Sequence, residues 1–253
     1  MNILLTVAYD GAAYSGWQRQ ENAVSIQGEL ERALSALFSR EIRVTAASRT
    51  DAGVHARGQK AAFKLDELRI PIDRLARVIN TRLPGDIAVS RAEYAGEGFS
   101  PRFDAERKTY RYAFLNSPYP DPLLRNYSWH IPRALDLEAM KAACPFFAGE
   151  HDFIAFSNAG RSVKTTVRTV YELRAERETY LNESRMITMY ITGSGFLYNM
   201  VRIIAGTLAQ VGLRKLPPGD IPGIIASKRR ENAGDTAPAR GLTLMEVCYR
   251  EHK

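Results

Sequence analysis

The sequence is poor in cysteine and has no long hydrophobic run. Only Cys144 and Cys248 occur among its 253 residues, so it carries neither a disulfide framework nor the paired cysteines of a zinc site. No apolar run approaches the ~20 residues needed to cross a bilayer. The N-terminal segment lacks the basic start and the small-residue cleavage site of a signal peptide. We therefore expect a cytoplasmic protein that does not contact a membrane.

Clusters of metal ligands are also missing. His55 follows Asp51 by four residues, but His130, His151 and His252 stand far from it and from one another. Because a zinc site needs three or four converging ligands, we expect no metal. His55 is interpreted instead as a brace for its own loop or as a contact to a ligand.

The chain has the composition of a soluble globular protein, with 45% hydrophobic and 25% charged residues, and it is basic, with a formal charge of +7. Residues 1–104 hold 14 Lys and Arg against 13 Asp and Glu, whereas residues 105–253 hold 21 against 15. The excess positive charge therefore lies in the second half, where it is either solvated surface or a phosphate-contacting groove. Its densest runs are Arg161, Lys164, Arg168, Arg174 and Arg177, and Lys228-Arg229-Arg230.

Hydrophobic periodicity predicts the same order of elements twice. Each half is expected to form a β-α-β-β-α-β unit, the ferredoxin-like plan of an α+β protein. Residues 1–104 and 105–253 form the two predicted domains, joined by a glycine-containing linker near 95–106. The strands of the first half are expected at 3–9, 42–47, 59–65 and 86–94, with helices at 26–38 after Ser25 and from Pro71; those of the second half are expected at 107–115, 167–177, 185–192 and 243–250, with helices at 137–147 after Asp136 and at 196–211.

The greatest density of reactive side chains lies between two predicted strands of the first half. Arg49, Thr50, Asp51 and His55 fall within ten residues, around Gly53. Asp favours turns by bonding its own backbone, so a purely structural Asp51 is one interpretation. The other is a nucleophilic carboxylate, kept ionised by the guanidinium of Arg49 two residues before it.

These residues are part of a resemblance that extends along the whole chain. Ordered blocks of the sequence resemble the tRNA pseudouridine synthase A family, and none departs from the family at its reactive positions. The blocks are Tyr9-Asp10-Gly11 with Tyr14-Ser15-Gly16-Trp17-Gln18, Ser48-Arg49-Thr50-Asp51-Ala52-Gly53-Val54-His55-Ala56, Lys108-Thr109-Tyr110-Arg111-Tyr112, His151-Asp152-Phe153 with Phe156, Gly195-Phe196-Leu197-Tyr198-Asn199-Met200-Val201-Arg202 and Ala237-Pro238-Ala239-Arg240-Gly241-Leu242-Thr243-Leu244.

The resemblance implies a role for individual residues. Asp51 would be the catalytic aspartate, with Arg49 as its ion-pair partner and Arg202 as a second cation. Tyr110 would stack on the target base, and Thr50 and His55 would contact the substrate. The fold implied is that of pseudouridine synthases, with two antiparallel sheets side by side and a cleft across them.

The resemblance also implies a substrate. Family members isomerise uridines at positions 38, 39 and 40 of the anticodon stem-loop of tRNA, work as homodimers and use base flipping. The reaction needs no redox change and no group donor, so no cofactor or other small molecule is expected. The alternative is a non-catalytic RNA-binding protein built from two ferredoxin-like modules, although the sequence contains no RNP1 string.

Overall fold

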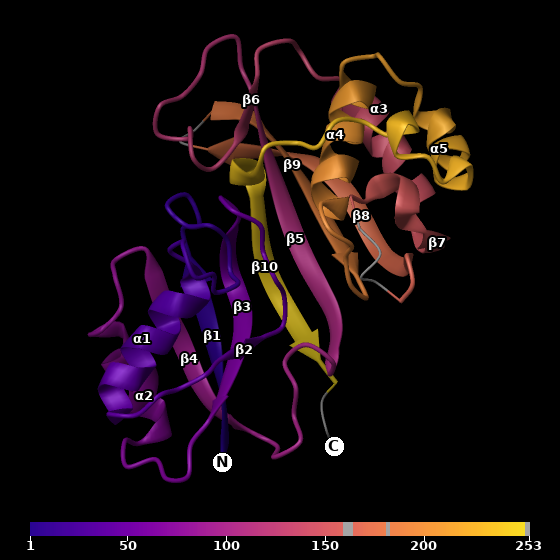
Figure 1. The fold of residues 1–253 in the computed structure, drawn as a ribbon. Helices are drawn as coiled ribbons and strands as arrows, with labels where there is room; N and C mark the ends of the chain where they lie inside the picture. Colours follow the sequence, from indigo (N-terminus) through magenta and orange to yellow (C-terminus); the bar gives the residue numbers. More distant parts are fainter. Residues whose placement is uncertain (159–163, 181–182, 251–253) are drawn as a thin grey trace. The chain divides into compact units, whose positions relative to one another are not determined.

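The computed structural model describes residues 1–158, 164–180 and 183–250. The chain forms two compact units, Met1–Glu106 with Thr243–Lys253, and Arg107–Leu242 (Figure 1). Each unit combines β-strands with helices, so the predicted α+β class is confirmed.

The first unit follows the predicted β-α-β-β-α-β order. In its sheet, β1 lies between β4 and β3 and is antiparallel to both. β2 is antiparallel to β3, while β10 is parallel to it. This is the strand arrangement of the split βαβ plan, extended by one strand. The elements are β1 (Asn2–Tyr9), α1 (Ile26–Phe38), β2 (Thr45–Ala46), β3 (His55–Lys64), α2 (Ile72–Asn80), β4 (Ile87–Ala95) and β10 (Leu242–Tyr249).

Helix α1 begins and ends where local chemistry predicts. Ser25 has an extended backbone, and its hydroxyl accepts a hydrogen bond from the Gly28 amide at 3.2 Å, which satisfies one of the open N–H groups of the first turn. The helix ends at Ser39, whose backbone is left-handed with φ 52°. The buried side chains Ile26, Leu30, Ala33 and Leu34 form one stripe toward the sheet.

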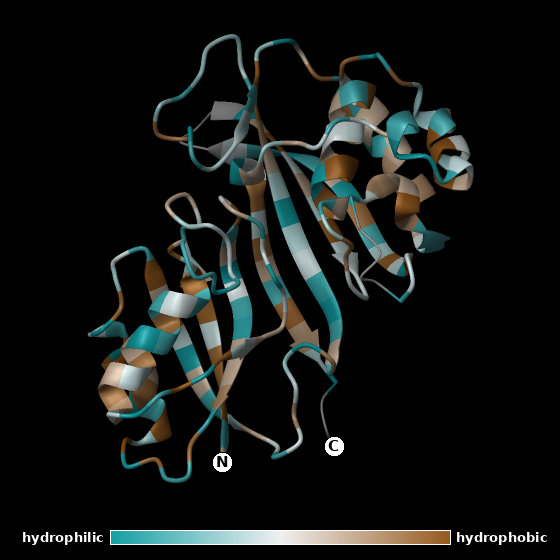
Figure 2. Cartoon of the chain, viewed as in Figure 1, coloured by the Kyte–Doolittle hydropathy of each residue, from teal (hydrophilic) through white to brown (hydrophobic). Residues whose placement is uncertain are grey.

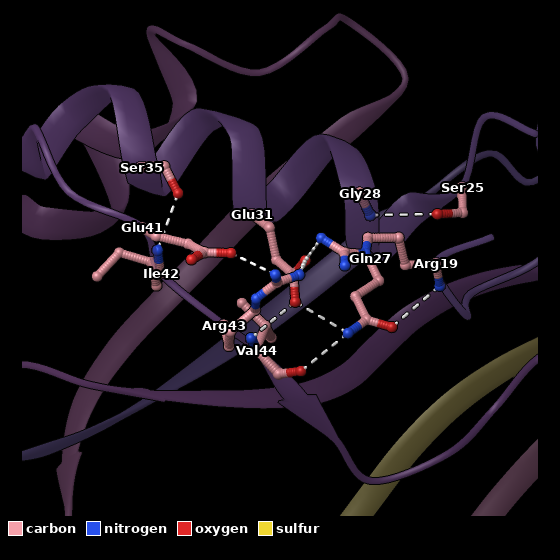
Figure 3. Close-up of polar contacts among 10 residues, drawn as sticks. All are labelled: Arg19, Ser25, Gln27, Gly28, Glu31, Ser35, Glu41, Ile42, Arg43 and Val44. Atoms are coloured by element: carbon pink, nitrogen blue, oxygen red, sulfur yellow. Dashed lines mark hydrogen bonds and ion pairs between the residues drawn. The ribbon is translucent and has the colours of Figure 1, made fainter. Parts of the chain in front are cut away.

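Strand β2 is much shorter than the predicted 42–47, because side chains of α1 bond the backbone before it (Figure 3). The Ser35 hydroxyl accepts from the Ile42 amide at 2.9 Å, and Glu31 Oε1 accepts from the Val44 amide at 3.0 Å. Gln27 Nε2 donates to the Val44 carbonyl at 3.1 Å. These residues therefore have helix side chains as partners in place of a neighbouring strand.

The second unit has an antiparallel sheet in the order β5-β9-β8-β7, with β6 parallel to β5. Helix α3 packs against α4 and β8. Figure 2 shows hydrophobic residues along β1 of the first unit and on α4 of the second, which is buried on nearly every side. The elements are β5 (Ala105–Asn116), β6 (Trp129–Ile131), α3 (Leu137–Ala143), η1 (Cys144–Phe147), β7 (Gly149–Asp152), η2 (Phe153–Phe156), β8 (Val167–Tyr180), β9 (Glu183–Gly193), α4 (Met200–Gly212), η3 (Pro218–Asp220), α5 (Ile221–Ser227), η4 (Arg230–Asn232) and η5 (Ala239–Gly241).

Two predicted helices of this unit have different bounds. The predicted helix 137–147 is α-helical only to Ala143 and continues as the 3-10 turn η1, because Pro145 has no amide hydrogen and its ring obstructs the preceding helical turn. The predicted helix 196–211 begins at Met200, because Asn199 has φ 61° and interrupts the right-handed backbone. Strands β6 and β7 and helix α5 were not predicted from the sequence.

The last strand belongs to a different unit from the one expected. The predicted second domain comprised residues 105–253, but Thr243–Lys253 groups with the first unit. The reason is the parallel pairing of β10 with β3, in which Thr243 is opposite His55 and Leu244 is opposite Ala56. Such a pairing between segments far apart in the sequence depends on tertiary structure.

Candidate active site

Asp51 lies in the loop between β2 and β3, at the first position of a tight turn. The Val54 amide donates to the Asp51 carbonyl at 3.1 Å, which closes the turn over residues 51–54. Gly53 has φ 77°, the positive value that a type II turn requires at its third position. The tight turn that the sequence suggested around Asp51 therefore exists, and the half-buried Asp51 is its first residue.

Burial alternates along the loop before the turn. Ser48 and Thr50 are buried, whereas Arg49 is exposed and Asp51 is half-buried. Alternation with a period of two directs Arg49 and Asp51 to one side of the chain and Ser48 and Thr50 to the other. The loop thus presents a guanidinium and a carboxylate outward while its intervening residues anchor it.

A buried network anchors the inward side of the loop. Gln59, on β3, is fully buried; its Oε1 accepts from the Ser48 amide at 3.2 Å, and its Nε2 donates to the Ser48 carbonyl at 2.7 Å. Gln59 Nε2 also lies 3.5 Å from the Tyr9 hydroxyl. That hydroxyl is 2.7 Å from the Thr50 hydroxyl. Both neighbours of Arg49 are therefore tied to β1 and β3, and Asp51 follows directly.

The segment before α1 packs against the same loop. The Trp17 amide donates to the Thr50 carbonyl at 3.0 Å, and the Gly53 amide donates to the Tyr14 carbonyl at 3.3 Å. Gly16 has φ +89°, and a Cβ there would lie 2.6 Å from the Thr50 carbonyl oxygen. Only glycine permits this approach, so Gly16 is required for the loop to sit where it does.

His55 is a buried brace at the other end of the turn. Its side chain is 6% exposed, and Nδ1 lies 3.1 Å from the Gly11 amide and 3.0 Å from Asp10 Oδ1. Nδ1 accepts from Gly11 when it carries no proton and donates to Asp10 when it carries one. Burial of Thr50 and His55 favours the bracing role for both over direct contact with a substrate; their contact with the substrate stays a prediction.

The approach to the loop is fixed by a buried carboxylate on α1 (Figure 3). Glu31 is only 6% exposed, and its Oε1 accepts from Gln27 Nε2 at 2.9 Å as well as from the Val44 amide. Its Oε2 lies 3.6 Å from a guanidinium nitrogen of Arg19 and equally far from one of Arg43. A buried charge needs such compensation, and the arrangement holds residue 44 in place just before β2.

Tyr110, on β5 of the second unit, is buried. The ring of Phe196 meets its ring edge to face, with centroids 5.3 Å apart and planes at 88°. Tyr112, two residues along the strand, is fully buried and donates from its hydroxyl to the Pro238 carbonyl at 2.8 Å. Tyr110 and Tyr112, two residues apart on the strand, thus lie on the same packed face. Stacking of Tyr110 on a base stays a prediction.

Arg202 lies in the first turn of α4 and has two defined partners. Its Nε donates to the Ala237 carbonyl at 2.8 Å, and its Nη1 donates to Asn199 Oδ1 at 2.9 Å. The side chain is half-buried, so it is not a helix-edge arginine that extends freely into water. The predicted site residues thus fall into two groups, Arg49, Thr50, Asp51 and His55 in the first unit and Tyr110 and Arg202 in the second.

The basic run Lys228-Arg229-Arg230 makes its contacts within the protein. Lys228 Nζ lies 3.0 Å from Asp152 and Arg229 Nε lies 2.7 Å from Glu231. Arg230 donates to the Gly234 carbonyl at 2.9 Å. These contacts favour a structural role for Lys228-Arg229-Arg230 over phosphate binding.

The structure describes only part of the other basic run, which comprises Arg161, Lys164, Arg168, Arg174 and Arg177. Arg161 lies outside the described residues. Arg174 pairs with Glu172 at 3.2 Å and covers the ring of Tyr190. Lys164 is exposed, and burial lowers the pKa of Arg168, which donates to two nearby backbone carbonyls.

No group of three His, Cys, Asp or Glu side chains arranged to hold a metal ion occurs in the described part of the chain. His252 lies beyond it. Over the same residues, no helix is both long and apolar enough to span a bilayer.

The residues that hold the loop were not predicted from the sequence. Gln59 and Tyr9 act through hydrogen bonds to residues 11 and 41 positions away. In the sequence, Glu31 is indistinguishable from an ordinary polar residue on the surface of a helix. The available signals were the glutamine at the start of the strand predicted at 59–65 and Gly16 next to Trp17.

Comparison with known proteins gives consistent matches over the whole chain. A profile of the tRNA pseudouridine synthase family matches residues 5–104 and 143–250. The chain is 47% identical to tRNA pseudouridine synthase A of Ruminiclostridium cellulolyticum, 48% identical to that of Caldicellulosiruptor bescii and 45% identical to that of Acetivibrio thermocellus. Each alignment covers 98% of this chain and 99% of its relative.

Proposed function

Because the chain belongs to the tRNA pseudouridine synthase family, we propose that it isomerises uridine in the anticodon stem-loop of tRNA, at positions 38, 39 and 40, with Asp51 as the reactive carboxylate. The chain is an isomerase of this family. The choice of stem-loop and the role of each side chain are the parts that we propose.

The reaction exchanges one glycosidic bond for another. The bond from uracil N1 to ribose C1′ breaks, the base turns, and a bond from C5 to C1′ forms. The C5 hydrogen leaves as a proton and N1 gains one, so substrate and product are isomers. Nothing is oxidised or transferred to a second molecule, and side chains alone can carry the reaction.

The observation that best supports Asp51 as the reactive carboxylate is the set of hydrogen bonds that hold its loop. A carboxylate that attacks C1′ or uracil C6, or takes a proton from the sugar, must be ionised and correctly placed. The hydrogen bonds of Gln59, Tyr9 and Trp17 to the two residues flanking Arg49 supply the placement. Arg49, on the same side of the loop as Asp51, supplies a positive charge two residues before the carboxylate.

The target uridine is stacked within a stem-loop, so it must be flipped out before reaction. Tyr110 is the proposed stacking partner, because an aromatic face accepts any base. Its edge contact with Phe196 holds the ring in one orientation. Arg202, fixed by two acceptors, is the proposed second cation for the reacting carboxylate.

Action at three neighbouring positions favours recognition of RNA by its shape and backbone over reading of base identity. The basic charge of residues 105–253 supports backbone contact. As the family resemblance implies, we propose that the enzyme works as a homodimer in the cytoplasm.

The test is incubation of purified protein with a tRNA transcript that carries tritium at uridine C5, in the presence of a chelator. Formation of the C5 glycosidic bond releases the tritium, and mass-resolved mapping locates the product. We expect release without added metal and product at positions 38, 39 and 40. Product confined to another region of the tRNA would overturn the substrate assignment. Tight binding without release would favour the RNA-binding alternative.

A further inference from the structure

Asn199, the residue before α4, has an unusual backbone for its position. Residues at a helix N-cap are normally extended, and their side chains accept hydrogen bonds from amides of the first turn. Asn199 instead has φ 61° and ψ 3°, and its side chain makes no capping bond. Asparagine tolerates this left-handed conformation better than most residues, and here it releases the carboxamide from the capping role.

The carboxamide of Asn199 binds Arg202 instead. Oδ1 accepts from Arg202 Nη1 at 2.9 Å, and the Ala237 carbonyl accepts from Arg202 Nε at 2.8 Å. The Ala237 amide donates in turn to the Arg202 carbonyl at 3.1 Å. Two acceptors from different parts of the chain therefore define the position of one guanidinium.

The segment that supplies Ala237 is itself pressed against α4. The Gly234 amide donates to the Thr207 hydroxyl at 2.9 Å. A Cβ on Gly206 would lie 1.8 Å from the Asp235 carbonyl oxygen, so the two backbones approach as closely as glycine allows. Close backbone packing and this hydrogen bond hold the segment against α4, and Asn199 supplies a side-chain acceptor to the same guanidinium.

The same segment is also fixed from its other end. Arg230 donates to the carbonyls of Ala233 and Gly234 and to the Thr236 hydroxyl, the last at 3.2 Å. Its Nε donates to Asn158 Oδ1 at 3.2 Å. Ala237 is thus presented to Arg202 by a short segment with several independent anchors.

We infer that Asn199 is a positioning residue for the isomerisation, acting through Arg202. The inference rests on the proposed role of Arg202 near the reacting carboxylate. A free arginine side chain has several rotatable bonds, and fixing it before the substrate binds removes that entropy cost from the reaction. The left-handed backbone at the start of α4 is the local feature that makes the contact possible.

Asn199→Gly is the informative variant, because glycine keeps the left-handed backbone and removes only the carboxamide. We expect kcat to fall about 10- to 100-fold, the range for loss of one hydrogen bond to a charged group. KM for tRNA and the melting temperature should change little. Asn199→Asp keeps an acceptor oxygen and should retain more activity than Asn199→Gly. Ser39→Gly, at a left-handed position ending α1, is the matched control and should leave kcat unchanged.

Two further measurements separate positioning from a merely structural role. In an Arg202→Ala background, Asn199→Gly should cause no additional loss of kcat, because the residue through which it acts is gone. In a nitrogen-proton NMR spectrum, the Nη1–H of Arg202 that donates to Asn199 should exchange slowly in the wild type and quickly in Asn199→Gly.

Wild-type kcat in Asn199→Gly, or an equal loss in both backgrounds, would overturn the inference. If the wild type does not isomerise tRNA at all, the proposed function fails. The NMR comparison then still decides whether Asn199 holds Arg202.

Discussion

The hydroxyl of Tyr9, at the end of the first strand, lies 2.7 Å from the hydroxyl of Thr50, the residue before Asp51. The bond is buried and joins residues 41 positions apart. It ties the proposed reactive loop to the centre of the first sheet, because β1 lies between β3 and β4.

The first prediction concerns the carboxylate itself. Asp51→Asn keeps the shape of the side chain and removes its charge, so turnover should fall at least about 10³-fold while tRNA affinity stays near the wild-type value. Single-turnover tritium release and a filter-binding assay measure the two quantities. Substantial turnover in the purified variant would rule out a nucleophilic Asp51.

The second prediction concerns the closeness of Gly16 to the loop. Gly16→Ala places a Cβ 2.6 Å from the Thr50 carbonyl and forces a strained positive φ. We expect a stability loss of about 1–3 kcal/mol, together with reduced turnover as the loop shifts. Thermal unfolding and tritium release measure both. Gly85→Ala, where an added Cβ meets nothing within 4 Å, is the matched control and should be nearly neutral.

The third prediction separates two roles of Tyr110. Tyr110→Phe keeps the ring and removes the hydroxyl, whereas Tyr110→Ala removes both. If only stacking matters, Phe should retain most turnover and Ala should lose about 1–3 kcal/mol of base binding. If the hydroxyl helps to move the C5 proton, both variants should be slow in tritium release. Wild-type turnover of Tyr110→Ala would exclude both roles.

The fourth prediction concerns the first basic run. If Arg161, Lys164 and Arg168 contact phosphates, their combined replacement by alanine should weaken tRNA binding and lower the salt slope by about 0.7–0.9 per contact. Turnover at saturating tRNA should change little. Arg229→Ala is the control, because Arg229 is paired with Glu231 and should leave the slope unaltered. An unchanged slope in the triple variant would mean that these charges are only solvated surface.

The fifth prediction concerns the two thiols. Burial raises the pKa of Cys144 to about 11, so its reactive thiolate is scarce well below that pH. Cys144 also donates to the Met140 carbonyl at 3.2 Å. At pH 8 a maleimide should label the half-buried Cys248 first, and Cys144 only after unfolding. Equal labelling rates in the native protein would contradict this assignment.

The amino-acid sequence by itself determined the elements whose signals are local. Ser25 and Asp136 cap the helices that follow them, as predicted, because an N-cap bonds an amide only three residues away. The periodicity of α1 likewise depends on neighbours one or two turns apart. The reactive groups around Asp51 could also be predicted, because they lie within one short segment of the chain.

Tertiary structure decided what holds those groups. The bonds of Gln59 and Tyr9 to the Asp51 loop depend on strand register, and the pairing of β10 with β3 joins segments far apart in the sequence. The contact of Arg202 with Ala237 depends on the close approach of a loop to α4. A hydrogen bond between residues distant in sequence forms only when the intervening chain has folded, so no local pattern of residues can encode it alone.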